Sequence, residues 1–255
     1  MDRKTKFINE LRYGGLTETE YMMCKPEILN RNADTLGWLL PVVVCFLIAL
    51  LGLSCIPGSG EENNRTLYLV SSIIFLAQLL YFKKVLPTHP EQSMIGCYIL
   101  LVCAFGLGIY ESVFLGDETT VSIFCVFSVA APMFLIDRPV KLVTLTILME
   151  IILVALVFTV GVTAGGEKYA VIDSVCSVII GLCCDVVVEK TKLSEIKNHL
   201  LLEKQRDTDI LTGAWSRIAY TQDLEDIRKN RIPVGIVFAD VNGLKQANDT
   251  YGHEV

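Results

Sequence analysis

An apolar stretch without a charged side chain opens the middle of the chain: Leu36-Gly-Trp-Leu-Leu-Pro-Val-Val-Val-Cys-Phe-Leu-Ile-Ala-Leu-Leu-Gly-Leu-Ser-Cys-Ile-Pro57. At about 1.5 Å of rise per residue, a helix of this length crosses the roughly 30 Å hydrocarbon core of a bilayer. Of the 255 residues, 52% are hydrophobic and 20% are charged. That balance is more apolar than a soluble domain usually shows. The stretch therefore predicts an integral membrane protein.

Five further apolar segments follow the first one. They lie at residues 66–82, 94–115, 119–136, 140–162 and 170–188. Each has about the length of a membrane-spanning helix, the second and fourth of the six being the shortest. The polar connectors between them are short, as between antiparallel neighbouring helices. We expect an α-helical polytopic membrane bundle of six spans over residues 36–188, preceded by a cytoplasmic segment, 1–35, with a short amphipathic surface helix around Phe7, Ile8 and Leu11.

Basic side chains orient the predicted bundle. One set of flanks carries the basic N-terminal segment and the following residues: Lys83, Lys84, Arg138, Lys141, Lys190 and Lys192. The opposite set carries only Arg65 and Lys168 among several acids. Because short cytoplasmic loops are enriched in Lys and Arg, this bias places both termini in the cytoplasm. We expect a multi-pass membrane protein with cytoplasmic N- and C-termini.

Charge and cysteine content exclude other classes. The net charge of −6 and the lack of a basic patch argue against a nucleic-acid partner. Eight of the nine cysteines lie inside apolar segments, where Cys packs as a small hydrophobic residue, and the chain has no C-x-x-C pair that would suggest zinc.

Three acidic residues mark the place to look for a sensing site in the membrane part. Glu150 lies near the middle of the fifth segment, whereas Glu111 and Asp173 lie toward the outer ends of the third and sixth. A carboxylate inside a bilayer is costly unless it is paired, protonated or faces a cavity. We expect an outer-half pocket for a cation or polar ligand here. The alternative is that Glu111 and Asp173 simply meet water at the interface.

Residues 189–206 are expected to continue the last span as a helical linker into the cytoplasm. Leu193, Ile196 and Leu200 step by three and four positions, which is the spacing of a coiled-coil seam. The seam predicts a homodimer contact. A helix that runs unbroken out of a membrane bundle can also transmit a rotation or a change of register.

The last part of the chain, residues 207–255, predicts a different kind of unit. Thr212-Gly213 forms a turn, and Ser216 caps a helix over residues 217–229. The apolar run at 234–239 predicts a buried strand. It leads into Asp240-Val-Asn-Gly-Leu-Lys-Gln-Ala-Asn-Asp-Thr-Tyr-Gly-His253, with a turn at Gly243 and a short helix over 244–250.

Two motifs in this unit resemble one known family. Asp209-Ile-Leu-Thr-Gly-Ala-Trp-Ser-Arg217 resembles the D-x-L-T-G-L-x-N-R opening of GGDEF domains, the diguanylate cyclase family. The segment from Asp240 to His253 resembles the D-x-D-x-F-K-x-x-N-D-x-x-G-H segment of that family, in the same order and at about the same distance. The resemblance covers about the last fifth of the chain. It implies the start of an α/β palm-like nucleotidyl-cyclase domain.

The resemblance also implies roles for five residues. Asp240 and the backbone carbonyl of Val241 would bind Mg²⁺ (or Mn²⁺). Asn248 and His253 would contact GTP, and Lys245 would stabilise the transition state at the crowded α-phosphate. Two such domains, each holding one GTP, would form cyclic di-GMP and release two diphosphates.

The chain departs from the family pattern in several places. Asn242 replaces the second Asp of the D-x-D pattern, and Ala214, Ser216 and Leu244 replace the usual Leu, Asn and Phe. The GG[DE]EF hairpin, which supplies the second metal carboxylate in the family, does not occur in these 255 residues. We therefore expect this segment to be inactive alone. The alternatives to a sensory diguanylate cyclase are a non-enzymatic receptor with a degenerate GTP-binding domain and a six-span transporter.

Overall fold

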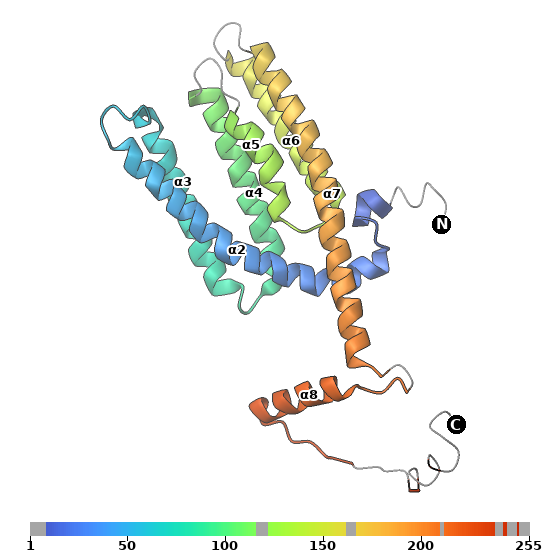
Figure 1. Cartoon of the computed structure of the whole chain (residues 1–255). Coiled ribbons are helices and arrows are strands. Elements are labelled where there is room, and N and C mark those ends of the chain that lie inside the picture. Colours follow the sequence, from blue (N-terminus) through green and yellow to red (C-terminus); the bar gives the residue numbers. More distant parts are fainter. Residues whose placement is uncertain are drawn as a thin grey trace. The chain divides into compact units, whose positions relative to one another are not determined.

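The computed structural model describes residues 9–115, 122–161, 167–209, 212–237, 242–243 and 249. Nearly all of this part is helical, and it contains no β-strand (Figure 1). The α-helices are α2 (Glu18–Ser54), α3 (Arg65–Val85), α4 (Ser93–Tyr110), α5 (Ser122–Ala130), α6 (Pro139–Leu156), α7 (Glu167–Asp207) and α8 (Arg217–Asn230). The short elements are 3-10 turns at Glu62–Asn64, Pro90–Gln92 and Pro132–Phe134 and π-helical turns at Glu111–Leu115 and Val157–Gly161.

Five helical stretches in the described residues are long and apolar enough to cross a membrane. They are Asn9–Ser54, Glu62–Val85, Pro90–Phe114, Pro139–Val160 and Val171–Asp207. This supports the predicted membrane protein. The count of six spans is not supported, because the fourth predicted segment gives only the shorter apolar stretch Ile123–Phe134. Pro132, which has no backbone N–H to continue an α-helix, follows the end of α5 closely.

The N-terminal segment and the first predicted span form one helix. Thr17 and Glu20 make a reciprocal capping box: the Thr17 hydroxyl accepts from the Glu20 backbone N–H, and the Glu20 carboxylate accepts from the Thr17 backbone N–H. α2 then continues past Pro26 and Pro41 to Ser54. The prediction of a separate surface helix is therefore wrong in the length of that helix. Only residues 9–13 form a short helical turn before the cap, and Phe7 and Ile8 lie outside the described residues.

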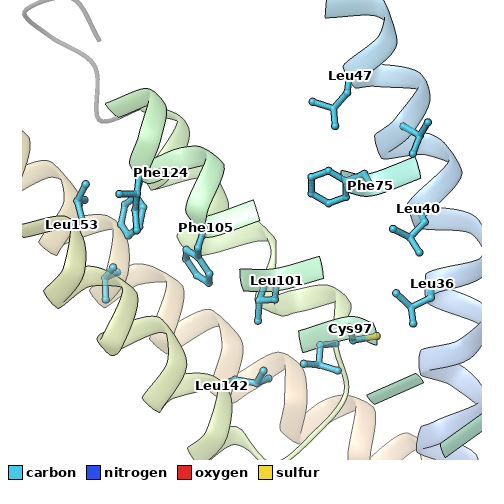
Figure 2. Packing of buried hydrophobic residues seen from close by; sticks show 14 of the residues in the cluster. Leu36, Leu40, Leu47, Phe75, Cys97, Leu101, Phe105, Phe124, Leu142 and Leu153 are labelled. Carbon is cyan, nitrogen blue, oxygen red and sulfur yellow. The ribbon is translucent and has the colours of Figure 1, made fainter. Parts of the chain in front are cut away.

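The core of the bundle is a cluster of large apolar side chains from the membrane helices. Leu36, Leu40 and Leu47 line one face of α2, as Figure 2 shows, across from side chains of α4, α5 and α6. The rings of Phe105 and Phe124 lie 5.8 Å apart, centroid to centroid. These contacts pack the helices directly against one another.

Two glycines let helices approach closely in this core. A Cβ atom on Gly108 of α4 would lie 2.9 Å from the Cα of Phe124 on α5. A Cβ atom on Gly181 of α7 would lie 2.7 Å from the carbonyl oxygen of Ser128, also on α5. Any larger residue would push α5 away, so small residues set these helix–helix distances.

Residues 189–206 are helical, as expected, because α7 runs without a break from Glu167 to Asp207. A second compact unit begins at residue 201. In this unit α8 begins where the sequence predicts, and the Ser216 hydroxyl accepts from the Ala219 backbone N–H at 3.3 Å. The turn at Gly213 is also confirmed, with a φ of +70°.

The described residues do not support an α/β fold in the second unit. Residues 232–237, most of the predicted buried strand, have no regular structure, and the side chain of Val237 is 92% exposed. A strand needs a neighbour to take its backbone hydrogen bonds, and no second strand is present in the described part of the chain. Ile218 of α8 is also exposed. The expected helix over 244–250 lies outside the described residues, apart from Asp249.

Candidate functional site

The residues of the predicted GTP and metal site lie outside the described part of the chain. These residues are Asp240, Val241, Lys245, Asn248 and His253. Next to them, Asn242 and Gly243 form the expected turn, in which Gly243 has a φ of +80°. This left-handed conformation is one that glycine adopts without strain.

The first motif of the resemblance closes a compact turn. The Asp209 carboxylate accepts hydrogen bonds from the backbone N–H of Thr212 at 2.9 Å and from its hydroxyl at 2.7 Å. The Asp209 backbone N–H donates to the Ala214 carbonyl at 2.7 Å, and its carbonyl accepts from the Gly213 N–H at 2.8 Å. The Asp, Thr and Gly of this motif therefore have a structural role, because they hold the chain in position for the cap of α8.

Glu150 has a partner within the bundle. Its side chain is buried on α6, and its Oε1 atom accepts from the Ser174 hydroxyl of α7 at 2.8 Å. Ser177, one turn further along α7, lies 3.1 Å from the Ser128 hydroxyl of α5. A serine thus satisfies one oxygen of Glu150, whereas the buried Oε2 atom has no hydrogen-bond partner among the described residues. Polar groups from α5, α6 and α7 lie together here.

The other two predicted sensing residues have different surroundings. Asp173 is exposed on α7, and it interacts electrostatically with Cys125, as Glu150 does. Glu111 is partly buried at the start of its π-helical turn, and its electrostatic neighbours are Glu61 and Tyr68. The structure therefore brings Glu150 and Asp173 near one residue, whereas Glu111 belongs with the start of α3.

A buried polar cluster that the sequence did not predict lies around Asp137, between α5 and α6. The Asp137 side chain is fully buried. Its Oδ1 atom accepts from the Tyr21 hydroxyl at 2.7 Å. Its Oδ2 atom accepts from the Tyr98 hydroxyl at 2.7 Å and from the Lys141 ammonium at 2.8 Å. The backbone N–H of Asp137 donates to Glu189 at 3.2 Å. The Asp137 carboxylate thus joins α2, α4 and α6, and the backbone N–H of the same residue connects it to α7.

The electrostatics of this Asp137 cluster favour the charged carboxylate. Burial alone would raise the pKa of Asp137, but the hydrogen bonds from Lys141, Tyr21 and Tyr98 outweigh burial and hold this pKa below its ordinary value. Asp137 therefore remains an anion that orients its donors.

Further contacts fix the connector that carries Asp137. Asn32 of α2 donates to the Ile136 carbonyl at 2.9 Å and accepts from the Ile136 N–H at 3.0 Å. Arg138 lies over the rings of Tyr13 and Tyr21, at 4.9 and 5.0 Å from their centroids. The connector is thus held by its backbone and by side chains from residues far away in the sequence.

The Asp137 cluster continues onto the linker part of α7. Glu189 is buried, and its Oε1 atom lies 3.2 Å from the Lys192 ammonium. Lys192 also donates to the Met133 carbonyl. The sequence contains only a weak signal for this cluster, because Lys141, at i+4 from Asp137, is its one local partner among the side chains named here. What the arrangement can do is couple the position of α7 to the ends of the neighbouring helices.

Comparison of the chain with known proteins identifies no related protein. No family model, no curated protein and no solved structure matches the chain. The class that the fold defines is a helical membrane protein with a second unit at its C-terminal end. Any narrower function must be argued from the residues themselves.

Proposed function

We propose that this chain comprises the membrane part and the start of the catalytic domain of a sensory diguanylate cyclase. The observation that carries the proposal is the pair of motifs, Asp209–Arg217 and Asp240–His253, which occur in the family's order. The compact turn made by Asp209, Thr212 and Gly213 supports it, since it gives the first motif a structural reason for its residues. The turn at Gly243 supports the second motif.

The proposed topology has six spans with both termini in the cytoplasm of a bacterial inner membrane. Five spans correspond to the long apolar helices. The remaining one is the segment 119–136, of which Ile123–Phe134 is described as a shorter apolar stretch. The basic flanks give the orientation. In this topology the Asp137 cluster and the linker part of α7 face the cytoplasm.

The proposed reaction converts two GTP molecules into cyclic di-GMP and two diphosphates. In each of two steps a 3′-hydroxyl loses its proton, its oxygen bonds to the α-phosphorus of the other nucleotide, and diphosphate leaves. Asn248 and His253 would orient GTP, and Lys245 would offset the charge that develops on the phosphate oxygens. Asp240 and the Val241 carbonyl offer oxygen ligands, which Mg²⁺ prefers. The bound ion would lower the charge at the reacting phosphate. The complete site would need two domains, hence a homodimer.

One residue favours a second candidate, a receptor that binds GTP without turning it over. Asn242 stands where the family has its second Asp, so the site has one carboxylate fewer. A neutral amide binds a divalent cation more weakly than a carboxylate does. Such a protein would regulate a partner through nucleotide binding.

The test is an activity and binding assay on the full-length gene product in lipid nanodiscs. With GTP and Mg²⁺, we expect cyclic di-GMP and diphosphate, and loss of both in Asp240→Asn. Asp226→Asn is the matched control, because Asp226 is exposed on α8 with only a long contact, 3.9 Å, to Lys229. GTP binding without product would favour the receptor. If the protein neither binds GTP nor forms product, both candidates are refuted.

A further inference from the structure

We propose that residues 9–31 form an intramolecular clasp over the seam of α7, and that this seam can pair with a second copy of the chain only when the clasp is released. The seam consists of Leu193, Ile196 and Leu200. The inference goes beyond the proposed function and does not depend on any nucleotide chemistry.

The seam is already covered by the chain's own N-terminal residues. Leu193 and Ile196 are 0% exposed, although they lie on the part of α7 beyond the predicted span. The covering side chains, themselves buried, are Tyr13, Leu16, Tyr21, Cys24 and Ile28. Leu200 packs against the edge of the same cluster. The apolar stripe that predicts a coiled coil is therefore covered by side chains of the same chain.

The turn at the start of the clasp fits closely against α7. Gly14 has a φ of +61°, and a Cβ atom on it would lie 2.7 Å from Leu193 Cδ1 and 3.5 Å from the Cα of Lys190. A side chain at position 14 would have to displace Leu193 and would also strain the backbone. Glycine is what allows the clasp to reach the seam.

Ion pairs flank the covered seam. Lys190 pairs with Glu10 at 3.2 Å, Lys197 with Glu20 at 2.8 Å, and Glu195 with Arg31 at 2.9 Å. Lys190 and Lys197 lie beside the apolar stripe, at positions that correspond to e in a coiled coil, whereas Glu195 lies further from it at a c position. Exposed pairs contribute little energy each but can select the partner and its register. The clasp thus presents to α7 the surface that a partner helix would present.

Pairing of the seam and closure of the clasp exclude each other. Knobs-into-holes packing requires the apolar seam to contact the partner helix directly. Leu193 and Ile196 have no exposed surface to offer while the clasp is closed. The described structure is therefore a closed state, in which the linker helix is protected from its predicted dimer contact.

The clasp is also connected to the membrane helices. Tyr21 covers the seam and donates its hydroxyl to Asp137, which Tyr98 of α4 and Lys141 of α6 also contact. A displacement of α4 or α6 at this end would act on Tyr21 through one shared carboxylate. The structure therefore provides a route by which a change among the membrane helices opens the clasp.

The test measures pairing of α7 in the full-length protein in its membrane. In a variant whose nine native cysteines are replaced by alanine, Leu200→Cys places a single thiol on the seam, and disulfide formation between copies is followed on non-reducing gels. We expect little cross-linking in this variant alone and several-fold more when Gly14→Val is added. Gly37→Val is the matched control, because a Cβ atom on Gly37 meets nothing within 4 Å. Equal cross-linking with and without Gly14→Val would overturn the proposal.

A second set of variants keeps the test valid if Gly14→Val fails to fold. Glu10→Lys should raise cross-linking, because it places a cation beside Lys190, and adding Lys190→Glu should lower it again by restoring the pair. A thiol at position 202, off the seam, where Leu202 is exposed, should not respond to either change. Unchanged cross-linking at position 200 in the Glu10→Lys variant alone would also refute the clasp. None of these outcomes depends on cyclase activity.

Discussion

The helical bundle and the C-terminal unit hold their polar side chains in different ways. In the bundle, Asp137 takes its hydrogen bond from Tyr21, 116 positions away in the sequence. In the C-terminal unit, Asp209 is bonded by Thr212, three positions away, and Arg206 reaches Gln222 over 16 positions. Loss of a contact between residues far apart in the sequence destabilises the structure as a whole, whereas loss of a local contact affects only the turn that contains it. The two regions should therefore respond differently to the loss of one polar group.

The apolar side chains differ in the same sense. In the bundle, exposed apolar side chains lie on helices that can face lipid. In the C-terminal unit, the side chains of Trp215, Ile236 and Val237 are 65%, 67% and 92% exposed, and they do not lie on long apolar helices of this kind. A unit of this size buries a small fraction of its surface, so its stability alone is marginal. The C-terminal unit thus has the apolar residues that a domain core needs, but the described residues do not pack into such a core.

The largest expected effect is that of Asp137→Ala. The change removes the acceptor for Tyr21, Tyr98 and Lys141 at a fully buried position. Loss of one partner in such a buried network costs on the order of 3 kcal/mol. We expect a marked fall in the Tm of the detergent-solubilised protein, followed by circular dichroism. Asp226→Ala in the C-terminal unit should stay within about 0.5 kcal/mol. Equal effects of the two would remove the contrast between the regions.

A second prediction concerns the close contact between α4 and α5. Gly108→Val would force backbone atoms of Phe124 to move, because a Cβ atom there lies 2.9 Å from its Cα. Overpacking of this kind costs about 1–3 kcal/mol. Gly106→Val, two residues earlier on the same helix, has nothing within 4 Å of its Cβ atom and should be near neutral. The difference in Tm between the two valine variants measures the contact. A larger loss in Gly106→Val would contradict the described packing.

Acid should weaken the bundle through Asp137. Its folded-state pKa lies below the ordinary value of 3.8, held there against burial by Lys141, Tyr21 and Tyr98. A carboxyl group with a lowered folded pKa contributes stability that is complete above its unfolded pKa and is lost as pH falls through the folded one. The bundle should therefore lose stability as pH falls below about 3.8. Asp137→Asn should remove this part of the pH dependence. The measurement is the Tm as a function of pH for the unaltered protein and for Asp137→Asn. Parallel curves would show that Asp137 does not cause the loss of stability in acid.

The sequence could predict those features that depend on neighbouring residues. Hydrophobic length located the apolar helices, the continuity of α7 and the start of α8 followed from local patterns, and glycine marked the turn at residue 213. It could not predict the Asp137 cluster, because Tyr21, Tyr98 and Glu189 come together only after the helices pack.

Two expectations depend on a partner that the local pattern does not identify. The periodicity of Leu193 and Ile196 shows that they need an apolar partner, but it does not show that residues 13–28 of the same chain supply it. The apolar run at 234–239 shows β-propensity, yet a strand depends on a neighbour that the described residues do not offer. A local pattern reports what a segment requires, while the partner is set by the fold.

The smallest expected effect is that of Ser216→Ala at the start of α8. The Ser216 hydroxyl accepts from the Ala219 backbone N–H, and loss of such a cap costs about 1 kcal/mol. Because the contacts in this unit are local, we expect faster amide hydrogen exchange in the first turn of α8 and no change in the bundle. Thr221→Ala, whose hydroxyl bonds only to the Arg217 carbonyl in its own helix, is the control and should not speed exchange at Ala219. If Ser216→Ala sped exchange in the bundle as well, the C-terminal unit would be coupled to the membrane helices more tightly than its own contacts account for, and α7 would be the element that carries that coupling.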